Sequence, residues 1–204
     1  KVIENGGYVH WARDAEEACS IIAEICKASG ARTVTKGKSM VSEEMYLNPA
    51  LEAVGMEVVE TDLGEYIVQL AGEAPSHIIA PAVHKTREQI TDLFHEHHSP
   101  LGYTDRVTQR EALVNEARSV LRERFVSADV GITGANFLVA ETGANVIVTN
   151  EGNGDLTSSL PKVHIVTAGI EKVIPSLEDL SVLLRVLAIS ATGQEFSAYT
   201  SIYS

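Results

Sequence analysis

Short runs of β-branched residues alternate with helical runs along nearly the whole chain, and this alternation most constrains the fold. Successive strand–helix–strand segments form right-handed crossover units, which build a parallel sheet. The apolar runs "NVIVT" and "VHIVT" favour strands that are buried on both faces. The predicted strands are residues 32–35, 56–61, 76–81, 128–135, 137–140, 145–150 and 162–169. The sequence therefore predicts an α/β fold with a largely parallel sheet flanked by helices, and a hairpin or meander inserted between residues 129 and 168.

The predicted helices carry recognisable start signals. They cover residues 14–30, 41–55, 85–98, 108–125 and 176–191. Asp14 is a predicted N-cap, and Gly30 marks the exit of the first helix. Three later helices begin with a capping-box spacing, in which a Ser or Thr precedes an acidic residue or Gln by three positions. These pairs are Thr86 with Gln89, Thr108 with Glu111, and Ser176 with Asp179.

Composition limits the kinds of partner that the chain can bind. Its 204 residues suit a single domain spanning residues 1–204, and the net charge of −12 argues against nucleic acid. No apolar run approaches the roughly 20 residues that a membrane span needs. The two cysteines, Cys19 and Cys26, are seven apart in a predicted helix, too far for a disulfide and too few for a zinc or iron–sulfur site. A reducing cytoplasm is the expected setting.

The run "TKGKSM" places cationic and hydroxyl side chains between a strand and a helix. A P-loop would need a glycine where Arg32 stands, so the nucleotide motif fails. Lys36, Lys38 and Ser39 could still hold an anion at the helix N-terminus. A solvated loop is an equally good interpretation at this stage.

Other polar residues follow predicted strands, where ligands bind in open α/β sheets. Asp62 and Glu65 come just after the strand at 56–61, and His84 precedes a helix. Turn chemistry and capping are the alternative interpretation. The histidines of "HEHH" lack a third ligand at a familiar spacing, so no metal site is predicted.

The segment "GITGANFLVAETGANVIVTNEGNG" is rich in glycine and in turn-forming polar residues. Glycine allows positive φ and lets a ligand or a second backbone approach closely. Turns account for some of these glycines, and a binding surface would account for the rest. The segment alone does not separate these two explanations.

Several long runs together resemble the LUD domain family: "TKGKSMVSEE", "VETDLGEYIVQLAGEAPSHIIAPAVHKTREQI", "ADVGITGANFLVAETGANVIVTNEGN", "LPKVHIVTAGIEKVIPSLEDL" and "SATGQEFSAYTS". Within the family, the likeness is to the iron–sulfur component of a cytoplasmic three-protein system that oxidises L-lactate to pyruvate. The resemblance implies a fold like that of glucosamine-phosphate deaminases, ribose-phosphate isomerases and CoA transferases. It also implies lactate-utilisation proteins A and C as partners. A ferredoxin-like region with [4Fe–4S] clusters is expected in the full-length protein, and no cofactor is expected in this segment, which lacks a cysteine cluster.

The resemblance also implies a site for a small anionic ligand at the strand ends. Residues 36–44, 62–65, 84–85 and 141–153 each follow a predicted strand and are expected at one rim, with Glu141 as the catalytic acid or base. The analogy with CoA transferases would instead make a glutamate a covalent nucleophile, and a third interpretation is that Glu141 only caps backbone N–H groups. The predicted binding residues are Lys36, Lys38, Ser39, Glu44, Asp62, Glu65, His84, Gly134, Thr142, Gly143, Asn150, Glu151 and Asn153. Two other functions stay open on the same fold: a stand-alone isomerase or acyl/CoA-transfer enzyme, and a non-catalytic scaffold.

Overall fold

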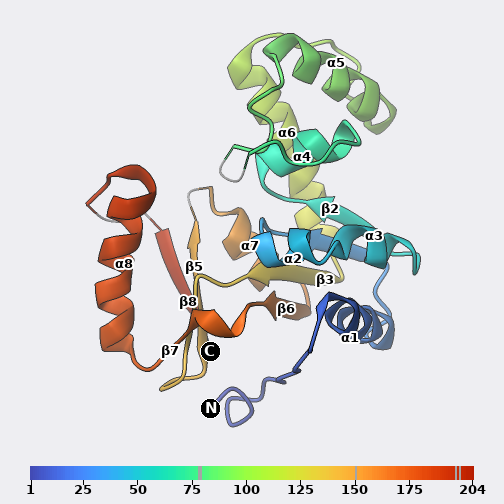
Figure 1. Ribbon diagram of the computed structural model, residues 1–204. Coiled ribbons are helices and arrows are strands. Elements are labelled where there is room, and N and C mark those ends of the chain that lie inside the picture. Colours follow the sequence, from blue (N-terminus) through green and yellow to red (C-terminus); the bar gives the residue numbers. More distant parts are fainter. Residues whose placement is uncertain (78–79, 150, 196, 198) are drawn as a thin grey trace.

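The computed structural model describes residues 1–77, 80–149, 151–195, 197 and 199–204. Its centre is a four-stranded parallel sheet in the order β2-β1-β3-β6. The strands are β1 (Thr33–Lys36), β2 (Glu57–Glu60), β3 (Val130–Gly134) and β6 (Val163–Thr167). Helices α1 (Ala15–Ala28), α2 (Met40–Glu44) and α3 (Leu47–Glu52) lie beside it (Figure 1). The predicted parallel sheet flanked by helices is confirmed.

Helices cover both faces of the parallel sheet. Val34 and Val130 are in-register neighbours and belong to one apolar core with residues of α1 and α3. Gly131, which follows Val130 in β3, faces the opposite side of the sheet and packs against α7 (Asn153–Ser159). Because side chains alternate along a strand, this pattern gives the sheet two distinct packed faces.

A second sheet is separate from the first and has the order β7-β4-β5-β8. Its strands are β7 (Val173–Ile174), β4 (Phe137–Val139), β5 (Ala144–Thr149) and β8 (Tyr199–Tyr203), with η2 (Ile170–Lys172) before β7. The predicted hairpin is confirmed as the antiparallel pair β4–β5. The hairpin lies in this second sheet and not beside the parallel strands, because β5 pairs on its other side with β8, for which no strand was predicted. Helix α8 (Leu177–Thr192) packs on this sheet through Leu180, Leu183 and Leu184.

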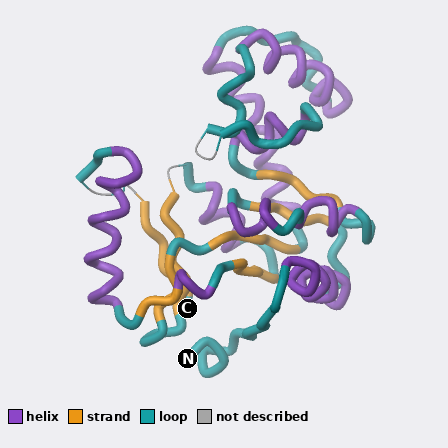
Figure 2. The backbone as a smooth tube through the Cα atoms, in the orientation of Figure 1, coloured by secondary structure: helices purple, strands orange, loops and turns teal. Residues whose placement is uncertain are grey.

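A helical excursion separates β2 from β3 and extends away from the sheets (Figure 2). It comprises α4 (Leu63–Leu70), α5 (Arg87–His98), η1 (Ser99–Leu101) and α6 (Arg110–Ser127), which share a core of their own. In that core the buried His98 lies between Tyr66 Oη, 2.9 Å from Nε2, and Glu116 Oε1, 2.8 Å from Nδ1. His98 from the "HEHH" run is therefore part of a buried hydrogen-bonded chain.

The base of the excursion is fastened to the parallel sheet by Asp129. Its Oδ2 accepts hydrogen bonds from Arg32 N at 2.8 Å and Thr33 N at 3.0 Å, where β1 begins. These two backbone hydrogen bonds, together with the hydrogen bond from the Thr33 hydroxyl group, hold the pKa of Asp129 below its usual range. The start of β1 and the start of β3 are thus tied together across a long stretch of chain.

Most of the predicted helix starts are confirmed. Asp14 and Ser176 cap α1 and α8, and Thr86 forms the full capping box with Gln89. The Thr108 cap is wrong, because α6 begins at Arg110 after Gln109, which makes no side-chain capping bond.

The strand predicted at residues 76–81 falls partly outside the described residues, since positions 78 and 79 are not among them. The described part is a bend and a turn, with Ser76 bonding Pro81 O through both its amide and its hydroxyl. Each helix among the described residues is too short or too polar to span a lipid bilayer.

Candidate functional site

A buried ion pair lies at the carboxyl ends of two neighbouring strands. Lys36 is the last residue of β1 and Glu60 the last of β2, and the two are in-register partners in the parallel ladder. Lys36 Nζ lies 2.9 Å from Glu60 Oε1, and the Lys36 residue is only 2% exposed. Burial raises the pKa of Glu60, and the attraction of Lys36 offsets part of that rise.

Acceptor oxygens gather around this pair without donors of their own. Asn48 Nδ2 of α3 donates to Glu60 Oε1 at 2.6 Å. Among the described residues, Glu60 Oε2, Asn48 Oδ1 and Glu43 Oε1 are buried and have no hydrogen-bond partner. Unpaired buried acceptors are costly, so their concentration marks this place as more than a packing contact.

Glu65 stands beside the pair, in the first turn of α4. It is only 3% exposed, and its Oε1 lies 3.9 Å from Lys38 Nζ. Burial and repulsion from Glu43 and Glu60 raise its pKa to about 7, although Lys38 opposes the rise. A carboxyl group with a pKa near neutrality can give or take a proton under physiological conditions.

The solvent side of the rim is also polar. Asp62 Oδ1 accepts from Gly64 N at 3.0 Å and so caps α4. Partial burial and the carboxylate of Asp62 raise the pKa of Glu151, which remains exposed, while Lys38 lowers it. Two lysines thus stand among the carboxyl groups of Glu43, Glu60, Asp62, Glu65 and Glu151.

Hydroxyl groups line the adjoining ends of β3 and β6. Ser42 Oγ lies 3.0 Å and Ser39 Oγ 3.4 Å from Thr167 Oγ1, which also bonds Thr133 O. A Cβ at Gly134 would come within 3.0 Å of Ser39 Oγ, so glycine allows this close approach. The predicted residues Ser39 and Gly134 therefore meet at one place.

The structure separates Glu141, Thr142 and Gly143 from the rim. They form the turn between β4 and β5, whereas Glu151 and Asn153 follow the other end of β5, about 17 Å away along six residues of strand. Glu141 Oε2 accepts from Leu177 N at 3.0 Å, at the start of α8. The expectation that residues 141–153 share one rim with Lys36 is wrong, because a strand runs through the middle of that range. The observed contact of Glu141 matches the capping alternative.

Two other predicted site residues lie away from the rim, and a third is not among the described residues. Asn150 lies outside the described residues. Glu44 is exposed on α2, while its neighbour Glu43 faces the rim. His84 bonds Ser76 Oγ and Glu73 Oε2, each at 2.7 Å, on the surface of the helical excursion. His84 therefore belongs to a different polar cluster.

Sequence reasoning missed Glu43, Asn48 and Glu60. Glu60 had a usable signal, since it is a charged residue at the end of a buried strand, directly across from Lys36. Glu43 and Asn48 had a weaker sequence signal. They lie in α2, of five residues, and α3, of six residues, and helices this short do not show in their periodicity which face is buried.

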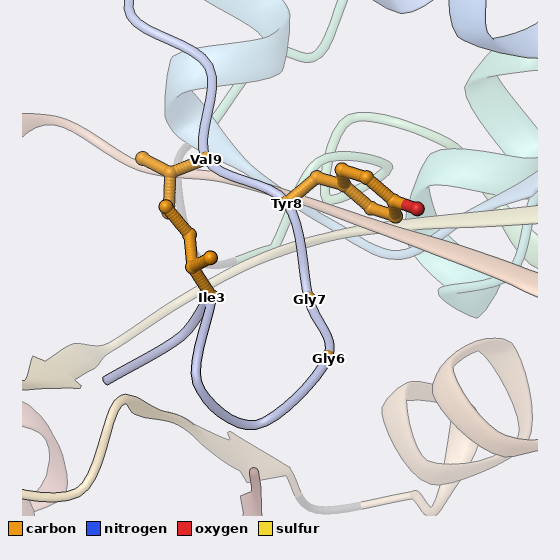
Figure 3. A pocket seen from close by; sticks show the side chains of 5 residues that line it. All are labelled: Ile3, Gly6, Gly7, Tyr8 and Val9. Atoms are coloured by element: carbon orange, nitrogen blue, oxygen red, sulfur yellow. The ribbon is translucent and has the colours of Figure 1, made fainter.

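Two hollows on the surface lie away from the charged residues of the rim. One, of about 310 Å³, is lined by Ile3, Gly6, Gly7, Tyr8 and Val9 of the N-terminal segment and has no charged lining residue (Figure 3). The other, of about 430 Å³, follows α6 near Tyr103 and Arg122. Neither includes a residue of the rim, and the buried charges of the rim carry the stronger chemical signal.

The titration of Glu65 gives a first testable prediction. Its pKa is higher in the folded protein than in the unfolded chain, so the folded state holds the extra proton and loses stability as pH rises toward 7. Between pH 5.5 and 7, the wild type should lose about 2 kcal/mol of unfolding free energy relative to Glu65→Gln. Urea unfolding of both proteins across this range measures the difference. A pH-independent difference would contradict the assignment, and Glu44→Gln is the exposed control.

Fold and rim together define an α/β domain with a charged site at the carboxyl ends of a parallel sheet, the usual ligand position in such sheets. The family model described as "LUD domain" matches residues 1–204, and the chain belongs to this family. It is 48% identical over 202 residues to lactate utilization protein B of Bacillus pumilus, and 46% identical over 202 residues to that of Anoxybacillus flavithermus. Each alignment covers 98% of this chain and 42% of the relative, so the chain spans less than half the length of these relatives. No solved structure matches it.

Proposed function

We propose that this chain is the LUD domain of a cytoplasmic protein that takes part in the oxidation of L-lactate to pyruvate. The names of the relatives, at 46–48% identity across nearly all of this chain, support the lactate-utilisation role. The [4Fe–4S] clusters and the association with lactate-utilisation proteins A and C are proposed for the longer protein. Within this domain, the proposed role is to bind a small carboxylate such as L-lactate or pyruvate at the rim.

The observation that carries the binding proposal is the different state of the two lysines. Lys36 is fully buried and already paired with Glu60, so it is a fixed part of the framework. The Lys38 side chain is 25% exposed and lies 3.9 Å from Glu65 Oε1 at the solvent side of the rim. A partly exposed ammonium can be reached from solvent by a ligand carboxylate, with which it can form a charge-assisted hydrogen bond.

The net acidity of the chain does not prevent such binding. Charges more than about 8 Å apart in solvent are largely screened at physiological ionic strength. The local groups then decide the affinity, and near neutral pH the raised pKa of Glu65 leaves that site partly protonated. A rim that can shed negative charge in this way accepts an anion more readily than its residue count suggests.

The test is a Lys38→Ala substitution in the full-length protein. We expect the dissociation constant for pyruvate to rise at least tenfold, because a charged hydrogen bond contributes about 1.5–3 kcal/mol. Growth on L-lactate of a host that depends on this protein should fall in parallel. Lys27→Ala, at an exposed position in the last turn of α1, is the matched control.

Two outcomes would redirect the proposal. Parent-like pyruvate binding and growth in Lys38→Ala would show that the rim is not a ligand site and would favour the scaffold function. Loss of growth in Glu141→Gln with pyruvate binding intact would place a second functional site at the β4–β5 turn.

A further inference from the structure

Helix α8 carries an apolar stripe on the side that faces away from the protein. Val182, Val186 and Ile189 are 58%, 56% and 60% exposed, and their spacings of four and three residues place them on one face of the helix. The opposite face packs on the second sheet through three leucines, of which Leu180 is only 3% exposed. In Figure 1, α8 stands at the outer edge of the molecule, with the second sheet on its inner side.

This α8 stripe has the form of a docking surface for another helix. Exposed apolar side chains are common singly, whereas a contiguous group of them marks an interaction surface. Three branched side chains at helical spacing form a ridge that fits the groove of a second helix. The 16 residues of α8 give it a length of about 24 Å, enough for a contact over several turns.

Two exposed charged residues lie along one side of the α8 stripe. Glu178 and Arg185 are seven residues apart, or two turns, so they project at nearly the same angle around the helix axis. Neither has a residue of opposite charge three or four positions away along α8. The ion pairs among the described residues include neither of them.

A second copy of α8, running antiparallel to the first, supplies a partner for both charges. In a two-fold antiparallel pair, residues on one side of the contact meet the same side of the other helix in reversed order. With the axis beside Val182, Arg185 of each copy lies opposite Glu178 of the other, and Val186 and Ile189 lie over the first turn of the other helix and the residues before it. An axis beside Val186 would instead bring the two Arg185 side chains together, which like charge disfavours.

We propose that α8 is a self-association surface, on which a second copy of this chain packs its own α8 antiparallel, with Val182 at the centre and two Arg185–Glu178 ion pairs at the border. The same patch then serves both copies, as a two-fold dimer requires. The apolar contact supplies the affinity, and the ion pairs fix the direction and register of the helices. This surface is separate from the rim and does not depend on the proposed function.

The net charge of −12 does not prevent two copies from meeting. Charges more than about 8 Å apart in solvent are largely screened at physiological ionic strength, so the residues beside the stripe decide the contact. One helix from each copy makes a small interface compared with those of permanent dimers. We therefore expect a reversible equilibrium between monomer and dimer.

The experiment is sedimentation velocity of the full-length protein over the micromolar concentration range, where we expect a concentration-dependent shift from monomer to dimer. Arg185→Glu and Glu178→Arg should each raise the dimer dissociation constant by about tenfold or more, because each replaces two attractions per dimer with two repulsions. The double variant Arg185→Glu/Glu178→Arg restores opposite charges across the contact and should recover the dimer.

A second pair of variants tests the apolar centre. Val182→Glu brings two carboxylates together at the two-fold axis and should leave the protein monomeric throughout the range. Val114→Glu, at a valine of α6 that is 44% exposed, is the matched control and should dimerise like the parent. Because both positions are exposed on helices, circular dichroism should show parent-like folding for both variants.

Three results would overturn the inference. A wild-type protein that stays monomeric would mean that another part of the longer protein, or a different partner, covers the α8 stripe. Equal dimerisation of Val182→Glu and the parent would place the dimer contact on another surface. A charge-reversed double variant no more dimeric than the single variants would exclude the pairing of Arg185 with Glu178.

Discussion

Replacing Gly131 with alanine is expected to lower the free energy of unfolding by at least about 4 kcal/mol, above the usual range for overpacking. An added Cβ would lie 1.9 Å from the carbonyl oxygen of Thr157 and 3.1 Å from Pro161 Cγ. The obstacle is backbone, in the helix α7 that covers this face of the sheet, so no side-chain rotation relieves it. Thr157 is itself fully buried and lies 3.3 Å from Thr61 through the hydroxyl groups.

Urea unfolding followed by circular dichroism measures this effect as a lower midpoint at constant slope. Gly37→Ala is the matched control, since it adds the same methyl group just beyond the neighbouring strand. There the new Cβ would lie 3.6 Å from Thr133 Cγ2, which is ordinary van der Waals contact. Equal midpoints for the two variants would show that α7 can move away from β3 at little cost, contrary to the packing described above.

Replacing Lys36 with methionine is expected to cost about 3–5 kcal/mol at pH 8, because it leaves the buried carboxylate of Glu60 without its cation. The loss should shrink as pH falls, since Glu60 can then become neutral by taking a proton. Burial already raises the pKa of Glu60, and removal of Lys36 raises it further, so the variant gains stability relative to the wild type as pH falls.

The double variant Lys36→Met/Glu60→Gln should recover most of the lost stability. It removes both charges and keeps an acceptor oxygen for Asn48 Nδ2. Urea unfolding of the single and double variants between pH 5 and 8 completes the cycle. A double variant that is no more stable than Lys36→Met would mean that the loss comes from packing of the lysine stem and not from the unpaired charge.

The strands and helices could be predicted from sequence because their signals are local. The runs "VHIVT" of the parallel sheet and "NVIVT" of the second sheet identify strands by residue type, although residue type does not say which sheet a strand joins. Asp14, Thr86 and Ser176 identify helix starts by side chains that bond nearby amides. The same logic correctly placed Lys36, Lys38, Asp62 and Glu65 at strand ends. These residues meet because parallel strands bring their carboxyl ends to one edge.

The second sheet and the buried site depend on pairings between residues that are distant in the sequence. No local pattern near Tyr199 predicts that β8 pairs with β5, and this pairing is part of the second sheet, which also contains the β4–β5 hairpin. The burial of Lys36 likewise depends on its register with Glu60 on another strand. The sequence predicts Glu44 in the site, whereas the structure places Glu43 there. The two side chains differ in direction by about 100° around the axis of α2, and a helix of five residues is too short for periodicity to tell them apart.

The pairing of β1 with β3 joins segments almost a hundred residues apart, with the helical excursion between them. During synthesis at about 5–20 residues per second, β1 leaves the ribosome roughly 5–20 s before β3 follows, and β2 roughly 4–14 s before it. Throughout that interval the strand that carries Lys36 has an unpaired edge, and the nascent chain cannot yet bury it. A chaperone that shields this edge, or a slower codon run after residue 134, would therefore be expected to change the yield of folded protein more than its final stability.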